Sequence, residues 1–141
     1  MRNFFIIHGS FGDSREHYLP WLKQNLEKFG EVFAPDFPVG KDLQTYENWA
    51  KVLDKYKNKI NEQTTFIGRS IAPIFIIKYL TNNNLKINKL ISISGFNGFI
   101  NIPDYDYVNK TFLMDNIDNF KKSCKHTICI YSKNDPYVPY Y

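Results

Sequence analysis

The sequence predicts an α/β fold: a three-layer α/β/α sandwich in which a mostly parallel sheet of about five strands lies between helices. Short apolar runs, rich in β-branched and aromatic residues, alternate with longer amphipathic segments along the chain. Gly, Pro and Asn separate these segments, as connections between strands and helices require. The 141 residues, of which 43% are hydrophobic and 23% charged, suit one globular domain over residues 1–141.

The first strand and helix occupy the N-terminal part of the chain. An apolar run at 4–7 predicts a buried strand, and the glycine-flanked segment 9–12 predicts a loop after it. Leucines then recur every three or four residues, which indicates an amphipathic helix over 18–29. Gly30 follows as the C-cap of that helix.

The next strand is brief and the next helix is long. The run at 32–34 indicates a strand, which Pro35 ends because proline cannot donate a backbone hydrogen bond. Between residues 43 and 60, aromatic and aliphatic side chains recur at helical spacing, with Lys and Asp on the other face. This pattern predicts a second helix over 43–60.

Two more strands frame a third helix. The run at 64–67 is β-branched and aromatic, and the run at 89–94 predicts another buried strand. The apolar segment 71–80 between them predicts a helix, which ends at the three asparagines 82–84.

The C-terminal part is less regular. Pro103 and many aromatic residues predict loop or short turns over 99–108, near the surface of a site. A weak helical pattern covers 112–120, and the run at 127–131 predicts the last strand. Because helices connect the strands, we expect ligands to bind at the carboxyl ends of a parallel sheet.

Ser70 is the strongest candidate for chemistry, because it lies between a β-type run and a helical run. Residues 68–72 are Gly-Arg-Ser-Ile-Ala, so the positions two before and two after the serine are small, as a nucleophile elbow requires. Pro73 fits only the first turn of a helix, which places the helix start at the serine. The alternative is an ordinary Gly-Ser turn that caps a helix.

Other groups in the sequence would support a nucleophile at this position. The backbone amides of Ile71 and of Ser10 or Phe11 are candidates for an oxyanion hole, because they follow the serine and the first strand. Asp135 follows the last strand, where a carboxylate can orient a histidine and stabilise its charged form. The alternative for Asp135 is that Asn-Asp-Pro only forms a turn.

These motifs resemble those of the small single-domain α/β-hydrolases of the retinoblastoma-binding protein nine type. The resemblance runs along essentially the whole chain and rests on HGSFGDSREHYLPWLKQNLEKFG, APDFPVG, TYENW, IGRSIAP, SGF and IYSKNDPYVPY. It implies an α/β-hydrolase core without the first two strands of larger members, with Ser70 as nucleophile and Asp135 as acid. It also implies a serine hydrolase of the esterase type, which acts on a small carboxylic ester or amide through an acyl-enzyme and needs no cofactor.

The sequence departs from that pattern in two places. Arg69 and Ala72 stand where such hydrolases usually have His and Gly. The catalytic histidine of these hydrolases follows the acid, and no histidine follows Asp135 here. The resemblance therefore implies an impaired triad in a chain that is a fragment or a shortened form, apparently missing its C-terminal part. None of the three histidines present is expected to replace the base: His8, His17 and His126.

The residues expected to bind substrate are His8, Phe96 and Phe99. His8 ends the first strand, where its main expected task is to hold the following loop by hydrogen bonds. The two phenylalanines, together with Tyr105 and Tyr107, either line an acyl pocket beside the serine or pack onto their own domain.

Metal and nucleotide sites are not expected. On a strand, residues 124 and 126 face one way and residue 129 the other, so Cys124, His126 and Cys129 do not converge on one ion. The sequence contains neither a P-loop nor a G-x-G-x-x-G motif. The two cysteines are expected to be free thiols.

Charge and hydropathy bound the partners. The excess of 18 Lys and Arg over 14 Asp and Glu gives a net charge of +4, but the lysines are scattered, so neither nucleic acid nor a membrane is expected as a partner. No signal peptide or membrane span is recognisable, which favours the cytoplasm. If no further strand follows 127–131, that strand is an exposed apolar edge through which the chain is expected to self-associate.

Two alternatives to an active hydrolase stay open. The chain could be a binding or interaction protein that keeps the hydrolase frame without the base. It could also be a truncated remnant with no separate function.

Overall fold

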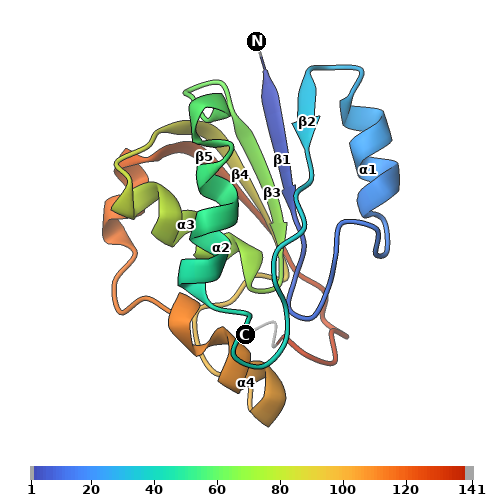
Figure 1. The fold of residues 1–141 in the computed structure, drawn as a ribbon, viewed down its shortest axis with the longest axis vertical. Helices are drawn as coiled ribbons and strands as arrows, with labels where there is room; N and C mark the ends of the chain where they lie inside the picture. The colour runs from blue at the N-terminus through green and yellow to red at the C-terminus, as the bar shows by residue number, and fades with distance from the viewer. Residues whose placement is uncertain (1, 139–141) are drawn as a thin grey trace.

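The computed structural model describes residues 2–138 and has three layers (Figure 1). The middle layer is one sheet with the strand order β2-β1-β3-β4-β5, in which every pairing is parallel. Its strands are β1 (Asn3–Ile7), β2 (Glu31–Phe33), β3 (Thr65–Arg69), β4 (Ile87–Ile93) and β5 (Cys124–Ile130). The three-layer α/β prediction is therefore confirmed, and the sheet is wholly parallel.

Helices cover both faces of this sheet. The helices are α1 (Leu19–Leu26), α2 (Tyr46–Asp54), α3 (Ala72–Asn82) and α4 (Pro103–Asn109). Side chains alternate along β1, so Phe5 and Ile7 pack into the cluster with α2 and α3, while Ile6 packs against α1. This alternation explains why the strand is apolar without interruption, since both of its faces are buried.

Several segments differ from their predicted structure. The helix predicted over 18–29 ends at Leu26 with Glu27 as its C-cap, so Gly30 is not the C-cap. The helix predicted over 43–60 is α2, followed by a 3₁₀ turn at Lys57–Lys59.

Residues 99–108, predicted to be loop, contain the helix α4. Pro103 stands in its first turn, where its fixed φ favours a helix, and two acidic residues in the same turn complement the positive helix end. The predicted helix over 112–120 is instead two short 3₁₀ turns, Lys110–Phe112 and Asp118–Lys122.

The strand β5 forms one edge of the sheet. It begins earlier than predicted, at Cys124, and no strand within residues 2–138 pairs with its outer side. Ile128 is 45% exposed and Ile130 is 49% exposed, as expected for an uncovered apolar strand.

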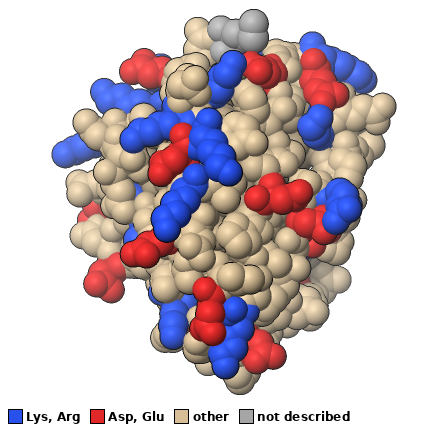
Figure 2. Space-filling view, viewed as in Figure 1, with Lys and Arg blue, Asp and Glu red and all other residues tan. Residues whose placement is uncertain are grey.

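Charged side chains of both signs are spread over the face of the molecule that Figure 2 shows. On the face shown in Figure 2, Lys and Arg lie among Asp and Glu. None of the helices in residues 2–138 has the length and apolar character needed to cross a membrane.

The strand order creates a crevice at the carboxyl ends of β1 and β3. From β1 the chain continues to β2 on one side, whereas β3 pairs with the other side of β1. In parallel sheets, loops leave such a point in opposite directions and ligands bind between them. The loop after β1 and the turn after β3 therefore meet at one place, and they carry Gly9 and Ser70.

Candidate active site

Ser70 occupies a tight turn between β3 and α3. Its φ is +59°, in the left-handed region, and its amide donates a hydrogen bond to the carbonyl of Ile93 at 3.0 Å. This conformation costs an L-residue about 1–2 kcal/mol. The predicted strand–turn–helix around the serine is therefore present, with a strained backbone at the hydroxyl-bearing residue.

Two glycines allow this turn to form. A Cβ at Gly68 would lie 2.9 Å from Cδ1 of Ile76 and 3.1 Å from Cβ of Ala72. A Cβ at Gly9 would lie 3.0 Å from Cβ of Ser70. A side chain at either position would be tightly crowded and would require its neighbours to shift, so glycine favours this close approach of helix, strand and loop.

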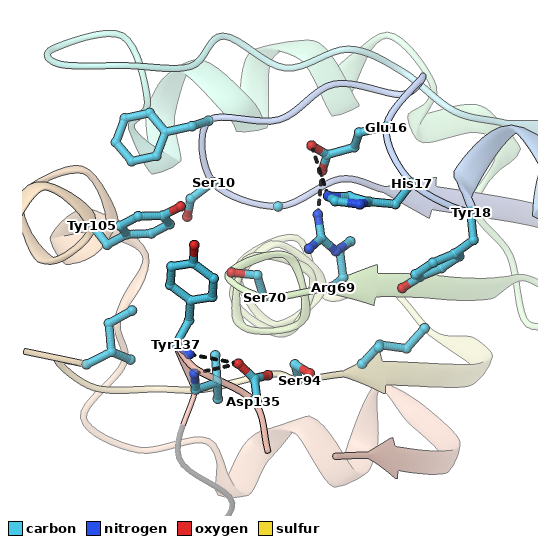
Figure 3. Close-up of a pocket in the computed structure, with 15 residues that line it drawn as sticks. Ser10, Glu16, His17, Tyr18, Arg69, Ser70, Ser94, Tyr105, Asp135 and Tyr137 are labelled. Atoms are coloured by element: carbon cyan, nitrogen blue, oxygen red, sulfur yellow. Dashed lines mark hydrogen bonds and ion pairs between the residues drawn. The ribbon is translucent and has the colours of Figure 1, made fainter. Parts of the chain in front are cut away.

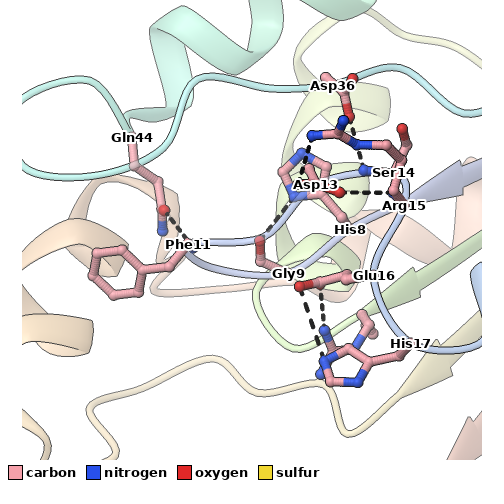
Figure 4. A network of polar contacts seen from close by, with 11 residues as sticks. His8, Gly9, Phe11, Asp13, Ser14, Arg15, Glu16, His17, Asp36 and Gln44 are labelled. Carbon is pink, nitrogen blue, oxygen red and sulfur yellow. Dashed lines mark hydrogen bonds and ion pairs between the residues drawn. The ribbon is translucent and has the colours of Figure 1, made fainter.

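Of the predicted oxyanion donors, one is already used. The Phe11 amide donates to Oε1 of Gln44 at 3.1 Å (Figure 4), so it is not free to donate to a ligand. Of the two residues predicted as oxyanion donors in this loop, Phe11 is therefore corrected, and Ser10 stays a prediction. The Ser10 and Ile71 amides donate to no loop or side-chain acceptor within residues 2–138.

His8 supports the loop and does not line the cavity. It is fully buried, and its Nε2 accepts a hydrogen bond from the Phe37 amide at 3.0 Å. Because an amide can only donate, the ring proton is on Nδ1, which lies 2.8 Å from the carbonyl oxygen of Gly9. Burial lowers the pKa of His8, outweighing the Gly9 hydrogen bond. His8 therefore holds the loop as expected. The prediction that His8 also binds substrate is wrong, because the side chain is fully buried.

Asp135 lies in the loop after β5 and faces the same cavity as Ser70 (Figure 3). Its Oδ1 accepts hydrogen bonds from the amides of Tyr137 at 2.9 Å and Val138 at 3.0 Å. Partial burial acts to raise the pKa of Asp135, but these amides, the Ser94 side chain and the charge of Arg69 together lower it. The carboxylate is therefore held in its charged form.

The cavity around these residues has a volume of about 430 Å³. Four of the predicted site residues line it: Ser10, Phe11, Ser70 and Asp135. Phe96 and Phe99 do not line it. Phe96 packs against the core beneath α3, and Phe99 is 66% exposed, so their predicted place at the substrate is corrected.

Other aromatic rings line one side of the cavity. The ring of Tyr105 lies between those of Phe11 and Tyr137, at centroid distances of 5.0 Å and 5.7 Å. Buried Ile100 and Val138 extend this apolar side. Tyr105 belongs to the aromatic set expected from the sequence. The rings of Phe11 and Tyr137 were not expected here, because they come from separate loops.

Charged and polar side chains line the other side, to the right of Ser70 in Figure 3. Arg69 Nη1 lies 2.5 Å from Oε1 of Glu16, and Tyr18 lines the same side. The Glu16 carboxylate fills the space that a side chain at Gly12 would need. In the sequence, the one sign of this ion pair was that Arg69 stands where similar hydrolases usually have His.

The histidines are not arranged as a triad. Among residues 2–138, His17 is the histidine that lines the cavity, and its Nε2 lies 3.9 Å from Oε2 of Glu16. His126 is in β5 and pairs with Lys89, toward the amino end of the sheet. No histidine in this part of the chain is hydrogen-bonded to Asp135. The same residues also contain no group of three or more His, Cys, Asp or Glu that could hold a metal ion.

A serine on a strained turn at the switch point of a parallel α/β sheet, facing a carboxylate beyond the last strand, is the arrangement of an α/β-hydrolase. The model of the serine hydrolase family matches residues 4–141, so this chain belongs to that family.

One curated relative is YdeN of Bacillus subtilis (strain 168). It is 30% identical over 144 residues, which cover 99% of this chain and 74% of YdeN. The crystal structure of the same B. subtilis gene product has a TM-score of 0.85 and 27% identity, over 99% of this chain and 76% of that one.

More distant structures share the fold. Est1E from Butyrivibrio proteoclasticus, solved with ferulic acid bound, has a TM-score of 0.71 at 18% identity, covering 99% of this chain and 72% of Est1E. Alpha/beta hydrolase domain-containing protein 10 from mouse has a TM-score of 0.69 at 13% identity, covering 97% of this chain and 71% of that protein. The chain therefore has the α/β-hydrolase fold.

Proposed function

We propose that the protein hydrolyses a small carboxylic ester or amide through an acyl-enzyme on Ser70, which acts as the serine of a nucleophile elbow. The observation that carries this proposal is the +59° φ of Ser70 at the mouth of a cavity that also contains Asp135. We also propose that the protein is a hydrolase of the retinoblastoma-binding protein nine type and that it is located in the cytoplasm.

In the proposed reaction, the Oγ of Ser70 forms a bond to the carbonyl carbon of the substrate as its proton passes to water. The carbonyl oxygen takes up negative charge beside the amides of Ser10 and Ile71. When this intermediate collapses, the bond to the alcohol or amine breaks and the leaving group takes up a proton from water. Water then attacks the acyl-enzyme, which releases the acid and restores Ser70.

The aromatic side of the cavity supports a substrate with a flat apolar group. Phe11 is 42% exposed and Tyr137 is 53% exposed, although both are large and apolar and lie against Tyr105. Burying such rings against a ligand ring gains about 0.5–1.5 kcal/mol per contact beyond the apolar area removed from water. The opposite side, with the Arg69–Glu16 pair, suits the polar part of the same molecule.

The proton on Ser70 needs an acceptor, and this step is expected to be slow. His17 reaches the cavity, but its side chain is 61% exposed and pairs with Glu16 instead of Asp135. A triad that lacks a properly oriented histidine loses most of its acceleration. The same observation favours a second candidate function, in which the cavity binds a small molecule without turning it over.

Labelling with a fluorophosphonate separates the two functions. We expect the probe to modify Ser70 slowly, located by peptide mass spectrometry. Ser70→Ala is expected to abolish labelling, and Ser123→Ala, at a buried serine away from the cavity, is expected to retain it. Absence of labelling at Ser70 under prolonged exposure favours the binding protein. Rapid labelling contradicts the expected impairment while supporting the hydrolase.

A further inference from the structure

Two buried amide side chains connect the loop after β1 to segments far away in the sequence. Gln44, just before α2, accepts a hydrogen bond from the Phe11 amide at 3.1 Å and donates from Nε2 to Oδ1 of Asn109 at 2.8 Å. Asn109 is the last residue of α4, and its Oδ1 also accepts from the Ser10 hydroxyl at 2.7 Å. Both amide residues are 2% exposed. The loop is therefore held at two adjacent residues.

The direction of every hydrogen bond in this chain is fixed by its first member. The Phe11 amide can only donate, so the oxygen of the Gln44 side chain must face it. The nitrogen of Gln44 then faces Asn109, which must present its oxygen. Because that oxygen can only accept, the Ser10 hydroxyl must donate. Rotating either side-chain amide by half a turn would put two donors or two acceptors together.

This arrangement has a cost in stability. Within residues 2–138, Nδ2 of Asn109 is buried and has no hydrogen-bond partner. Leaving such a group unpaired costs about 1–3 kcal/mol, so an apolar pair of the same size would hold α4 against α2 at lower cost. What an apolar pair cannot supply is a fixed orientation of the loop backbone.

We propose that Gln44 and Asn109 are positioning residues for the oxyanion hole. They hold the Phe11 amide away from the cavity and Ser10 at its edge, so that the Ser10 amide is the donor that this loop offers to the reacting oxygen. Phe11 has a φ of +58°, a strained conformation that the bond to Gln44 helps to hold. The inference rests on the proposed function, because it assigns the loop to the oxyanion of a reaction at Ser70.

The effect of the amide pair should be seen in the binding of a tetrahedral adduct. Oxyanion donors act because they are in place before the charge develops, and removing one costs about 10²–10³ in rate. Displacing a donor by about 1 Å has a comparable effect on a well-positioned reaction. Loosening the loop is therefore expected to weaken an adduct at Ser70 by about tenfold or more.

The probe is phenylboronic acid, titrated against the whole chain by calorimetry. The Oγ of Ser70 forms a bond to boron and its proton passes to solvent, which leaves a negatively charged tetrahedral boronate with an oxygen in the oxyanion hole. Gln44→Met keeps the size of the side chain and removes both hydrogen bonds. We expect it to weaken binding about tenfold or more, and Ser10→Ala, which removes one hydrogen bond, to weaken it by a smaller factor.

The control is Tyr79→Phe, which removes a partly buried hydrogen bond of 2.7 Å to Asp54, between α3 and α2 and outside the cavity. It should lower the melting temperature, as Gln44→Met does, and leave boronate binding unchanged. Equal affinities of the wild type and both loop variants overturn the positioning role, as does equal weakening by Tyr79→Phe. If the wild type binds no boronate while Ser70 is intact, the proposed function itself fails.

Discussion

Replacing Ser70 by glycine and by alanine tests whether the strained turn is real. Ser70 has a φ of +59°. Both substitutions remove the hydroxyl, so its loss cancels when the two variants are compared with each other. They differ in the Cβ of residue 70, which lies beside Gly9, and in backbone preference, since glycine adopts a left-handed conformation freely and alanine does not.

The expected difference can be worked out from two opposing effects. Relief of the left-handed strain favours the glycine variant by about 1–2 kcal/mol. The larger freedom of glycine in the unfolded chain disfavours it by about 0.5–1 kcal/mol. The Ser70→Gly variant should therefore be more stable than Ser70→Ala by about 0.5–1 kcal/mol, which is a rise of about 2–4 °C in melting temperature.

Urea unfolding followed by circular dichroism measures this difference as a shift in midpoint at constant slope. The matched control is Ser123, where φ is −100°. There the order should reverse, with Ser123→Ala more stable than Ser123→Gly, because no strain is relieved. If Ser70→Ala is as stable as Ser70→Gly, the backbone at position 70 is not strained and the argument for a nucleophile at this turn loses its main support.

Three further results are expected. Burial lowers the pKa of His8 below its ordinary 6.5, so between about pH 7 and pH 5 the unfolded chain binds a proton that the folded chain excludes. The free energy of unfolding should therefore fall as the pH falls, and it should fall less steeply in His8→Gln. Equal slopes in the wild type and the variant would contradict this. Tyr105→Ala should raise KM for an ester that carries an aromatic ring by about tenfold, because it removes the central ring of the aromatic side. It should change KM for an ester without a ring only a little. Equal effects on both esters would argue against an aromatic subsite. The exposed edge β5 should cause self-association at micromolar concentration in sedimentation velocity, reduced in Ile130→Lys, and a monomeric wild type would exclude this role for the edge.

Several parts of the site could be predicted because their signals are local. Gly68, Ser70 and Pro73 lie within a few residues of one another, and a strand, a sharp turn and a helix start follow from their backbone preferences. The loop after the first strand was likewise indicated by its glycines. The order of strands and helices then places both at the carboxyl edge of a parallel sheet.

Other parts of the site depend on contacts between distant segments. Glu16 meets Arg69 and Gln44 meets Asn109 only because the loops and helices that carry them pack together. The neighbouring residues mark Arg69 as unusual beside the serine, but they do not indicate Glu16 as its partner, and nothing around Gln44 or Asn109 indicates that pair. For the same reason, the sequence could not show that Phe96 and Phe99 lie away from the cavity.

The sequence by itself determined the alternation of strands and helices and the position of the serine at the turn between β3 and α3, because periodicity, turn residues and backbone preferences act over a few neighbouring residues. The tertiary structure decided which amide of the first loop is bonded to Gln44, which rings form the apolar side of the cavity and which cation stands beside the serine. Those features depend on side chains brought together by the packing of the whole chain, and on the requirement that each buried polar group find a partner of the right kind.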